Sequence, residues 1–202
     1  MSAQPAPGGR RAETKAVNRA TILAAARDLF AEQGYGAVTV RDIIRRTDLA
    51  SGTFYNYFAD KESVFRALIG ESAVQARVLV RAAHRDSKTA HDFVASSFRA
   101  YLGFVARDPT TFRLARRNAG TIRELFDVPV IGAGVAELAE DLEAGMDRGL
   151  LARQDPEYMA AAMVGTAFEL ATRMSERDPP DIEGAVVFAT NLFVAVLTPH
   201  PL

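Results

Sequence analysis

Cysteine is absent from the 202-residue chain, so disulfide bonds and thiolate chemistry are both excluded. A net charge of −1 by itself argues against a general nucleic-acid-binding protein. Residues 1–9 contain no apolar segment, and we expect them to form a disordered tail and not a signal peptide. The longest strongly apolar run, Val186–Leu197, is interrupted by Thr190 and Asn191 and is too short to span a bilayer. These absences predict a soluble, cytoplasmic protein.

Strands are not expected, because no stretch shows sustained two-residue alternation of apolar and polar side chains. Apolar residues make up 49% of the sequence, which is enough for a sizeable core, and they recur at helical spacing. The sequence therefore predicts an all-α fold. Beyond residue 86 the expected helices are the longer ones, over residues 88–107, 109–126, 129–149, 158–177 and 181–197.

The charges are distributed unevenly along the chain. Residues 1–61 contain nine Lys and Arg against six Asp and Glu, whereas the remainder contains fifteen against nineteen. A basic first part followed by an acidic remainder indicates a polyanion as the partner of the first part only. An ordinary solvated surface is the alternative explanation.

The first predicted helix begins near Asn18 and ends at Gly34, because the apolar residues between them follow one helical face. Thr39 and Asp42 then have the spacing of a capping box, with Asp in place of the commoner Glu. This box predicts a short second helix that ends near Thr47.

We expect a tight turn at Asp48, because Asp tolerates a left-handed backbone. A third helix is predicted over residues 51–57, and Asp60 is expected to cap a fourth. Phe54 and Phe58 are expected to face the core of this small domain. Two short helices joined by a turn after a longer helix form a helix-turn-helix, whose second short helix enters the DNA major groove.

The third predicted helix and its surroundings are rich in groups suited to DNA. Small residues at its start allow close approach, while hydroxyl and amide groups serve as hydrogen-bond donors. Lys61 adds charge in the first turn of the next helix, where free N–H groups attract phosphate. For Tyr57, packing within the domain stays open as an alternative. The predicted DNA-binding residues are Thr39, Arg41, Ser51, Gly52, Thr53, Tyr55, Asn56, Tyr57 and Lys61.

Residues 17–68 resemble the N-terminal DNA-binding domain of TetR-family transcriptional regulators. The resemblance lies in the LF-x-x-x-G-Y helix end at Leu29–Tyr35, the T-V-R-D-I start at Thr39, the G-T-x-Y-x-Y-F run from Gly52 and the Asp-Lys-Glu step at 60–62. It covers about a quarter of the chain, and the motifs are specific in combination.

The resemblance implies a flexible N-terminal arm over residues 1–16, a helix-turn-helix DNA-binding domain over 17–62 and a helical ligand-binding and dimerisation domain over 63–202. It further implies contacts to the DNA backbone from Thr39, Thr53, Tyr55 and Lys61, and positions near base edges for Ser51, Gly52 and Asn56.

Three positions depart from the family's pattern. Asp48 replaces a usual Gly, Ala50 replaces a frequent Ser at the helix cap, and Ser51 replaces a common Lys. Losing a good cap costs about 1 kcal/mol, unless Ser51 caps the helix with a one-residue shift. Losing the lysine removes about one phosphate charge from the salt dependence. The arm residues that we expect to compensate, by reaching the minor groove, are Arg10, Arg11 and Lys15.

In the family, the last two long helices pair with a second subunit as a four-helix bundle. Both predicted C-terminal helices are here more apolar than a lone surface helix needs. A twofold dimer also places two recognition helices at half-sites of a pseudo-palindromic operator. That both helices are simply monomer core stays open as an alternative.

The family's C-terminal helices also form a ligand pocket. Aromatic and apolar residues of this region predict a small hydrophobic or aromatic effector, and polar residues near position 116 are expected to anchor an acidic head group. Ordinary core packing and a solvated basic surface are the alternatives. The predicted ligand-binding residues are Phe98, Tyr101, Phe112, Arg116, Asn118, Met163 and Phe168.

Catalysis, metal binding and cofactor binding have no positive support. The run VPVIGAGVAE over residues 128–137 imitates a dinucleotide-binding turn, but Glu137 replaces the third glycine and no βαβ unit follows. His84 and His91 lack an evident third metal ligand, and no Ser-His-Asp arrangement with local motifs is found. We therefore expect no catalytic residues, no metal and no cofactor.

Two hypotheses remain. The first is a ligand-responsive, homodimeric DNA-binding repressor that a small hydrophobic effector releases from its operator. The second is an all-helical small-molecule-binding or enzymatic protein whose helix-turn-helix no longer reads DNA, an alternative motivated by Ser51 and by the near-neutral net charge. A steep fall of DNA affinity with salt would favour the first.

Overall fold

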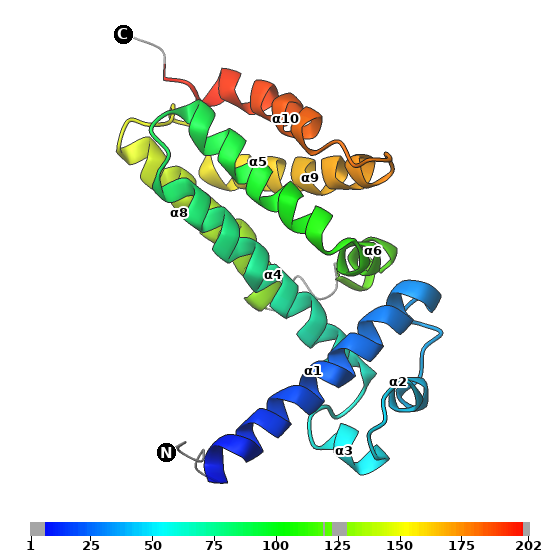
Figure 1. Ribbon diagram of the computed structural model, residues 1–202. Helices are drawn as coiled ribbons and strands as arrows, with labels where there is room; N and C mark the ends of the chain where they lie inside the picture. Colours follow the sequence, from blue (N-terminus) through cyan, green and yellow to red (C-terminus); the bar gives the residue numbers. More distant parts are fainter. Residues whose placement is uncertain (1–6, 119, 123–128, 200–202) are drawn as a thin grey trace, which may run out of the picture.

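The computed structural model describes residues 7–118, 120–122 and 129–199, and over these residues it contains helices and no strands (Figure 1). The predicted all-α fold, with an N-terminal helix-turn-helix and a larger C-terminal helical part, is confirmed. The helices are α1 (Pro7–Gln33), α2 (Val40–Arg46), α3 (Ser51–Tyr55), α4 (Lys61–Arg85), α5 (Ala90–Arg107), α6 (Pro109–Arg117), α8 (Pro129–Asp147), α9 (Pro156–Ser175) and α10 (Ile182–Leu197).

The head domain consists of α1, α2, α3 and the first turns of α4, which share one core. Phe30 from α1, Ile43 from α2, Phe54 from α3 and Phe65 from α4 are each at most 1% exposed. The rings of Phe30 and Phe65 meet edge to face with their centroids 5.9 Å apart. The core is therefore closed only when all four helices are in place.

Side-chain caps define the helix starts in the head domain. The backbone N–H of Thr39 donates to Asp42 Oδ2 at 2.9 Å, and the Asp42 N–H donates back to Thr39 Oγ1, so the predicted capping box is confirmed. Asp60 caps α4, as predicted, and accepts from the Ser63 N–H at 2.7 Å. The cap of α3 is Ala50, which has no side-chain hydrogen bond, so Ser51 does not replace the missing cap.

Several helix boundaries differ from the sequence expectations, those of α1 and α3 among them. Helix α1 begins at Pro7 and not near Asn18, so the predicted flexible arm is helical from residue 7 onward. Residues 11–17 of this helix are exposed, and apolar periodicity therefore misses them, although Ala, Arg, Glu and Lys are good helix formers. Helix α3 ends at Tyr55, short of the predicted residue 57.

The turn at Asp48 is made without a left-handed residue, since among the described residues only Gly34 and Gly149 have positive φ. Helix α6 ends at Arg117 and Asn118 caps it, so a single helix over 109–126 is wrong. Residues 123–126 of that expectation lie outside the described residues.

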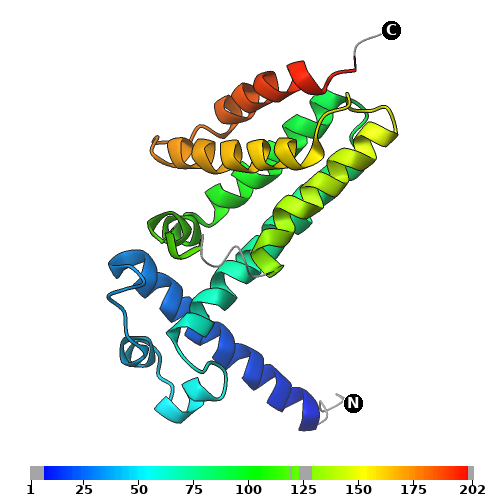
Figure 2. The same cartoon turned by 180° about the vertical axis from the view of Figure 1, so that it is seen from behind.

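The larger domain is built around α5, which packs against α4 on one side and α10 on the other, while α8 packs against α4 and α9 (Figures 1 and 2). Its core contains buried side chains from α5, α8, α9 and α10, including Phe93, Leu102, Leu142, Met163 and Phe193. Helix α4 contributes Phe65 to the core of the head domain, and at its other end the buried His84 stacks on Phe93 of the larger domain. None of the helices within the described residues is long and apolar enough to cross a membrane.

Candidate nucleic-acid interface

Helix α3 is held against the head domain by two phenylalanines. Phe54 is 1% exposed and Phe58, just after the helix, is 6% exposed, as the sequence predicts. The opposite side of the helix is free of such packing: Tyr55 is 60% exposed, although its ring meets that of Phe54 with centroids 5.3 Å apart. One side of α3 is therefore packed in the core of the head domain, and the other side faces solvent.

The predicted contact residues in α3 and in the two residues after it differ in their exposure. Positions 51, 52 and 55 fall on one helical face by their spacing. Thr53 is half-buried and Tyr57 packs partly against the head core. The exposed members of the set are Ser51, Gly52, Tyr55 and Asn56.

Helix α2 exposes three arginines, of which two are paired within the domain. Arg45 lies 2.9 Å from Asp42 and Arg46 lies 3.1 Å from Glu32. Arg41 is exposed and has no ion pair within the described part of the chain, which leaves its charge available to a partner. Thr39 is exposed, and its hydroxyl is engaged in the capping box.

Lys61 is placed differently from the sequence expectation. Its Nζ donates to Tyr35 O and Val38 O, both at 2.9 Å, and lies 4.6 Å from the centroid of the Tyr35 ring. These carbonyls follow the end of α1, where backbone acceptors lack partners within a helix. The ammonium group thus joins α4 to the α1–α2 connection, and a contact to phosphate is not the role this geometry favours.

The predicted ligand-binding residues with apolar side chains all lie in the core of the larger domain. Phe98 stacks on Phe193 with centroids 5.7 Å apart, and Phe112 meets Phe168 at 5.5 Å. Met163 is buried, while Tyr101 and Phe168 pack partly buried against the same cluster. Burial raises the pKa of Tyr101 to about 12, so its phenol is neutral.

Arg116 and Asn118, predicted as anchors for an effector head group, both bond to other parts of the protein. Arg116 is exposed, and its Nη1 lies 3.0 Å from Glu176 Oε1 in a surface ion pair. The Asn118 amide donates to Leu114 O at 2.9 Å, and its Oδ1 accepts from the Tyr35 N–H at 3.3 Å. Arg116 therefore joins α6 to the end of α9, and Asn118 joins it to the connection between α1 and α2.

Arg117 forms a connection that sequence reasoning did not find. Its Nη1 donates to Ala31 O at 2.8 Å and to Glu32 O at 2.9 Å, at the C-terminal end of α1. The last carbonyls of any helix need outside donors, but the sequence does not show that the donor comes from 85 residues away. Cations also interact favourably with a helix C-terminus.

Helix α6 completes the head core as well. Leu114 is fully buried in the cluster of the head domain, and Ala115 packs partly buried against it. Through Arg117 and Asn118, this helix of the larger part of the chain is bonded to the end of α1 and the residues that follow it. A displacement of α6 would therefore disturb the head-domain core into which α3 packs.

A buried polar network joins three helices of the larger domain, although the sequence showed no Ser-His-Asp arrangement. His84 on α4 has Nδ1 at 2.9 Å from Asp141 Oδ2 on α8 and Nε2 at 2.7 Å from Ser97 Oγ on α5. The Ser97 hydroxyl also contacts Phe93 O within its own helix. Because Ser97 is only 6% exposed, the group ties helices together and does not present a nucleophile at the surface.

The N-terminal part of the chain matches a known family. Residues 22–68 match the sequence model described as bacterial regulatory proteins, tetR family. The resemblance to TetR-family regulators is thereby confirmed for the head domain. The matched residues include the whole predicted DNA-binding set.

Solved structures extend the similarity to the whole fold. The fatty acid degradation regulator FadR from Bacillus halodurans is 21% identical, with 95% of this chain and 97% of that chain covered and a TM-score of 0.76. A tetR-family regulatory protein from Rhodococcus RHA1 is 22% identical, with 91% and 98% covered and a TM-score of 0.74. FadR from Bacillus subtilis in complex with stearoyl-CoA is 22% identical, with 87% and 97% covered and a TM-score of 0.76.

Proposed function

We propose that this protein is a ligand-responsive transcriptional repressor that binds a pseudo-palindromic operator as a homodimer and is not an enzyme. The observation that supports it most is the exposure pattern of α3 and the residues just after it: Phe54 and Phe58 are buried, while Ser51, Tyr55 and Asn56 are exposed. This is what a recognition helix needs in order to enter a major groove. Such a protein acts in the cytoplasm, where the DNA is.

The proposed dimer uses α9 and α10. Phe188, Leu192 and Val196 follow one another at four-residue spacing on α10 and are 59%, 50% and 46% exposed. Val187 beside them and Tyr158 on α9 are also exposed. An apolar stripe of this extent is costly to leave in water and marks a protein contact. A twofold pairing of the stripe places the two heads on one side for two half-sites.

The proposed release mechanism passes through α6. An effector bound among the helices of the larger domain shifts the balance between two arrangements of α6 and α4 only if it binds one of them more tightly. Because Arg117 and Asn118 bond α6 to the end of α1, each arrangement sets a different position for the head. The spacing of two heads in a dimer then changes the affinity for the operator.

The proposed effector is a small hydrophobic molecule. Support comes from the aromatic cluster of Phe98, Phe112 and Phe168, and the expectation of an acidic head group loses Arg116 and Asn118 as its anchors. Since the similar FadR from Bacillus subtilis was solved with stearoyl-CoA, long-chain acyl-CoA and the free fatty acid are the first compounds to test.

Fluorescence anisotropy on DNA from just upstream of the protein's own gene tests the proposal, with a scrambled duplex and a salt series. We expect selective binding that Tyr55→Ala weakens at least tenfold, while Tyr55→Phe, which keeps the ring, retains more of it. Arg148→Ala in the larger domain is the control and should bind like the wild type.

The alternative function makes the opposite forecast. If the head no longer reads DNA and the chain serves only to bind or convert a small molecule, then neither the upstream DNA nor fragments selected from the genome will bind selectively. Weak salt dependence on every duplex would favour this alternative, because it means that few phosphates are contacted.

A further inference from the structure

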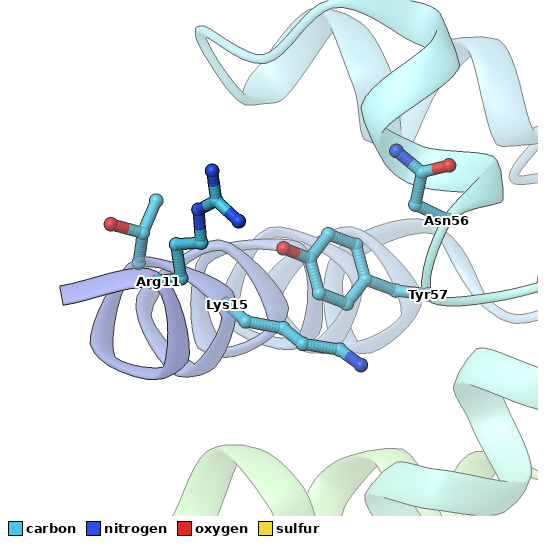
Figure 3. A pocket seen from close by; sticks show the side chains of 5 residues that line it. Arg11, Lys15, Asn56 and Tyr57 are labelled. Carbon is cyan, nitrogen blue, oxygen red and sulfur yellow. The ribbon is translucent and has the colours of Figure 1, made fainter. Parts of the chain in front are cut away.

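The N-terminal turns of α1 and the end of α3 enclose a hollow on the surface of the head domain (Figure 3). It has a volume of about 490 Å³ and is lined by Arg11, Thr14, Lys15, Asn56 and Tyr57. The first three residues share one face of α1 because they are three and four positions apart. Figure 3 shows the Tyr57 ring extending from the end of α3 toward the face of α1 that carries Arg11 and Lys15.

The hollow is positively charged. Within the described part of the chain neither Arg11 nor Lys15 has an ion pair. Glu13, the nearest acid in sequence, lies two positions from each of them and therefore points away from their face of the helix. Two unpaired cations beside an amide and a phenol form a set of donors that suits a phosphate group, since Arg and Lys bind phosphate by charge and Asn and Tyr by hydrogen bonds.

We infer that this hollow is a clamp for the DNA backbone beside the recognition helix, an inference that rests on the proposed function. Asn56 and Tyr57 directly follow α3, so a phosphate strand flanking the groove that α3 enters lies next to the hollow. Figure 1 shows the N-terminal end of α1 on the same side of the head as α3. The clamp supplies charge from α1 beside α3, where Ser51 stands in place of a common lysine.

The helical state of residues 7–33 decides which part of the DNA is contacted. An α-helix with side chains is about 10 Å across, whereas the minor groove of B-DNA is about 6 Å wide. A helix therefore does not follow that groove as an extended arm does, and the sequence expectation of a minor-groove contact is replaced by a backbone contact. Because the helix is formed before binding, the clamp also avoids the entropy cost of ordering an arm.

The salt dependence of DNA binding tests the clamp directly. Each lost phosphate contact lowers the slope of log K against log salt concentration by about 0.9, so we expect the double variant Arg11→Ala, Lys15→Ala to lose about 1.8. The loss should be the same on the upstream DNA and on a scrambled duplex, because backbone contacts carry no sequence information. Alanine is the best helix former, so α1 should retain its helix, which circular dichroism checks.

The matched control is the double variant Lys88→Ala, Arg113→Ala, which removes one Lys and one Arg, both exposed, from the larger domain. Its slope should equal that of the wild type. An unchanged slope in the Arg11, Lys15 variant overturns the clamp. If that unchanged slope comes with a loss of preference for the upstream DNA, the two residues read bases and do not bind phosphates.

The two proposals fail in different ways. The slope on a scrambled duplex at low salt is measurable whether or not the operator is known, so the clamp is tested even if selective binding is not found. If wild type and control bind selectively but the Arg11, Lys15 variant keeps the wild-type slope, the clamp fails and the proposed function stands. If no duplex binds, both fail.

Discussion

His84 and Asp141 are joined by a hydrogen bond of 2.9 Å between Nδ1 and Oδ2, inside the larger domain and 57 residues apart in the sequence. The other ring nitrogen reaches Ser97, and the ring itself stacks on Phe93 with centroids 4.1 Å apart. One imidazole thus connects α4, α5 and α8. Since α4 also carries Phe65 in the core of the head, the state of this imidazole bears on the helix that joins the two domains.

The first prediction concerns pH. Burial is the largest effect on His84 and lowers its pKa below 6.5, with Arg81 acting in the same direction and Asp141 against it. The folded state therefore binds fewer protons than the unfolded state near that pH. Stability is complete above the unfolded pKa and falls as the pH drops below it toward the lowered folded value. We expect the unfolding free energy of the wild type to fall between pH 7.5 and 5.5.

His84→Gln should flatten this part of the pH dependence, whereas His91→Gln should not, because His91 is exposed. Urea unfolding across the pH range measures both. The comparison uses the slope with pH and not the absolute stability, since His84→Gln also disturbs packing. Equal slopes in the wild type and His84→Gln would contradict the prediction.

The second prediction concerns Arg117. Its guanidinium donates to Ala31 O and Glu32 O, and Arg117→Ala should lower the unfolding free energy by about 1–2 kcal/mol, as expected for hydrogen bonds from a charged group at a partly exposed site. It should also weaken the release of DNA by effector more than it weakens DNA binding. Anisotropy titrations with and without effector measure this difference.

The neighbouring Arg116 supplies the control for that variant. Its ion pair with Glu176 is exposed, and such pairs contribute about 0–1 kcal/mol. Arg116→Ala should therefore leave both stability and effector response close to the wild type. If the two variants behave alike, the bond between α6 and the end of α1 does not carry the response.

The third prediction separates two roles for Lys61. Because its ammonium group bonds to Tyr35 O and Val38 O, Lys61→Ala should lower the unfolding free energy by about 1–3 kcal/mol. The salt slope of DNA binding should stay as in the wild type. Lys88→Ala, at an exposed position, is the control for stability. A slope lower by about 0.9 without loss of stability would instead mean that Lys61 binds a phosphate.

The fourth prediction concerns the apolar stripe of α10. Leu192→Glu places a charge in the middle of the proposed dimer contact and should yield monomers in size-exclusion chromatography with light scattering. Operator affinity should fall at least tenfold, because one head alone contacts one half-site. Val78→Glu on α4, where the side chain is 63% exposed, is the control. A dimer that survives Leu192→Glu would place the contact elsewhere.

Much of the head domain was predictable because its determinants are local. The capping box of Thr39 and Asp42 and the cap at Asp60 involve residues three positions apart, and the burial of Phe54 and Phe58 follows from helical spacing. Such features need only the backbone geometry of one helix. The start of α1 was missed for a related reason: residues 11–17 are exposed, so no apolar periodicity marks them.

The connections that matter most for the proposed response depended on the tertiary structure. Periodicity tells which side of a helix is buried but not which other helix covers it. The bonds from Lys61 to Val38, from Arg117 to Ala31 and from His84 to Asp141 span 23, 86 and 57 residues. The sequence by itself therefore determined the helical fold, the caps at Thr39 and Asp60 and the buried side of α3. Only packing decided that Arg117 meets the end of α1 and that Lys61 bonds to backbone carbonyls.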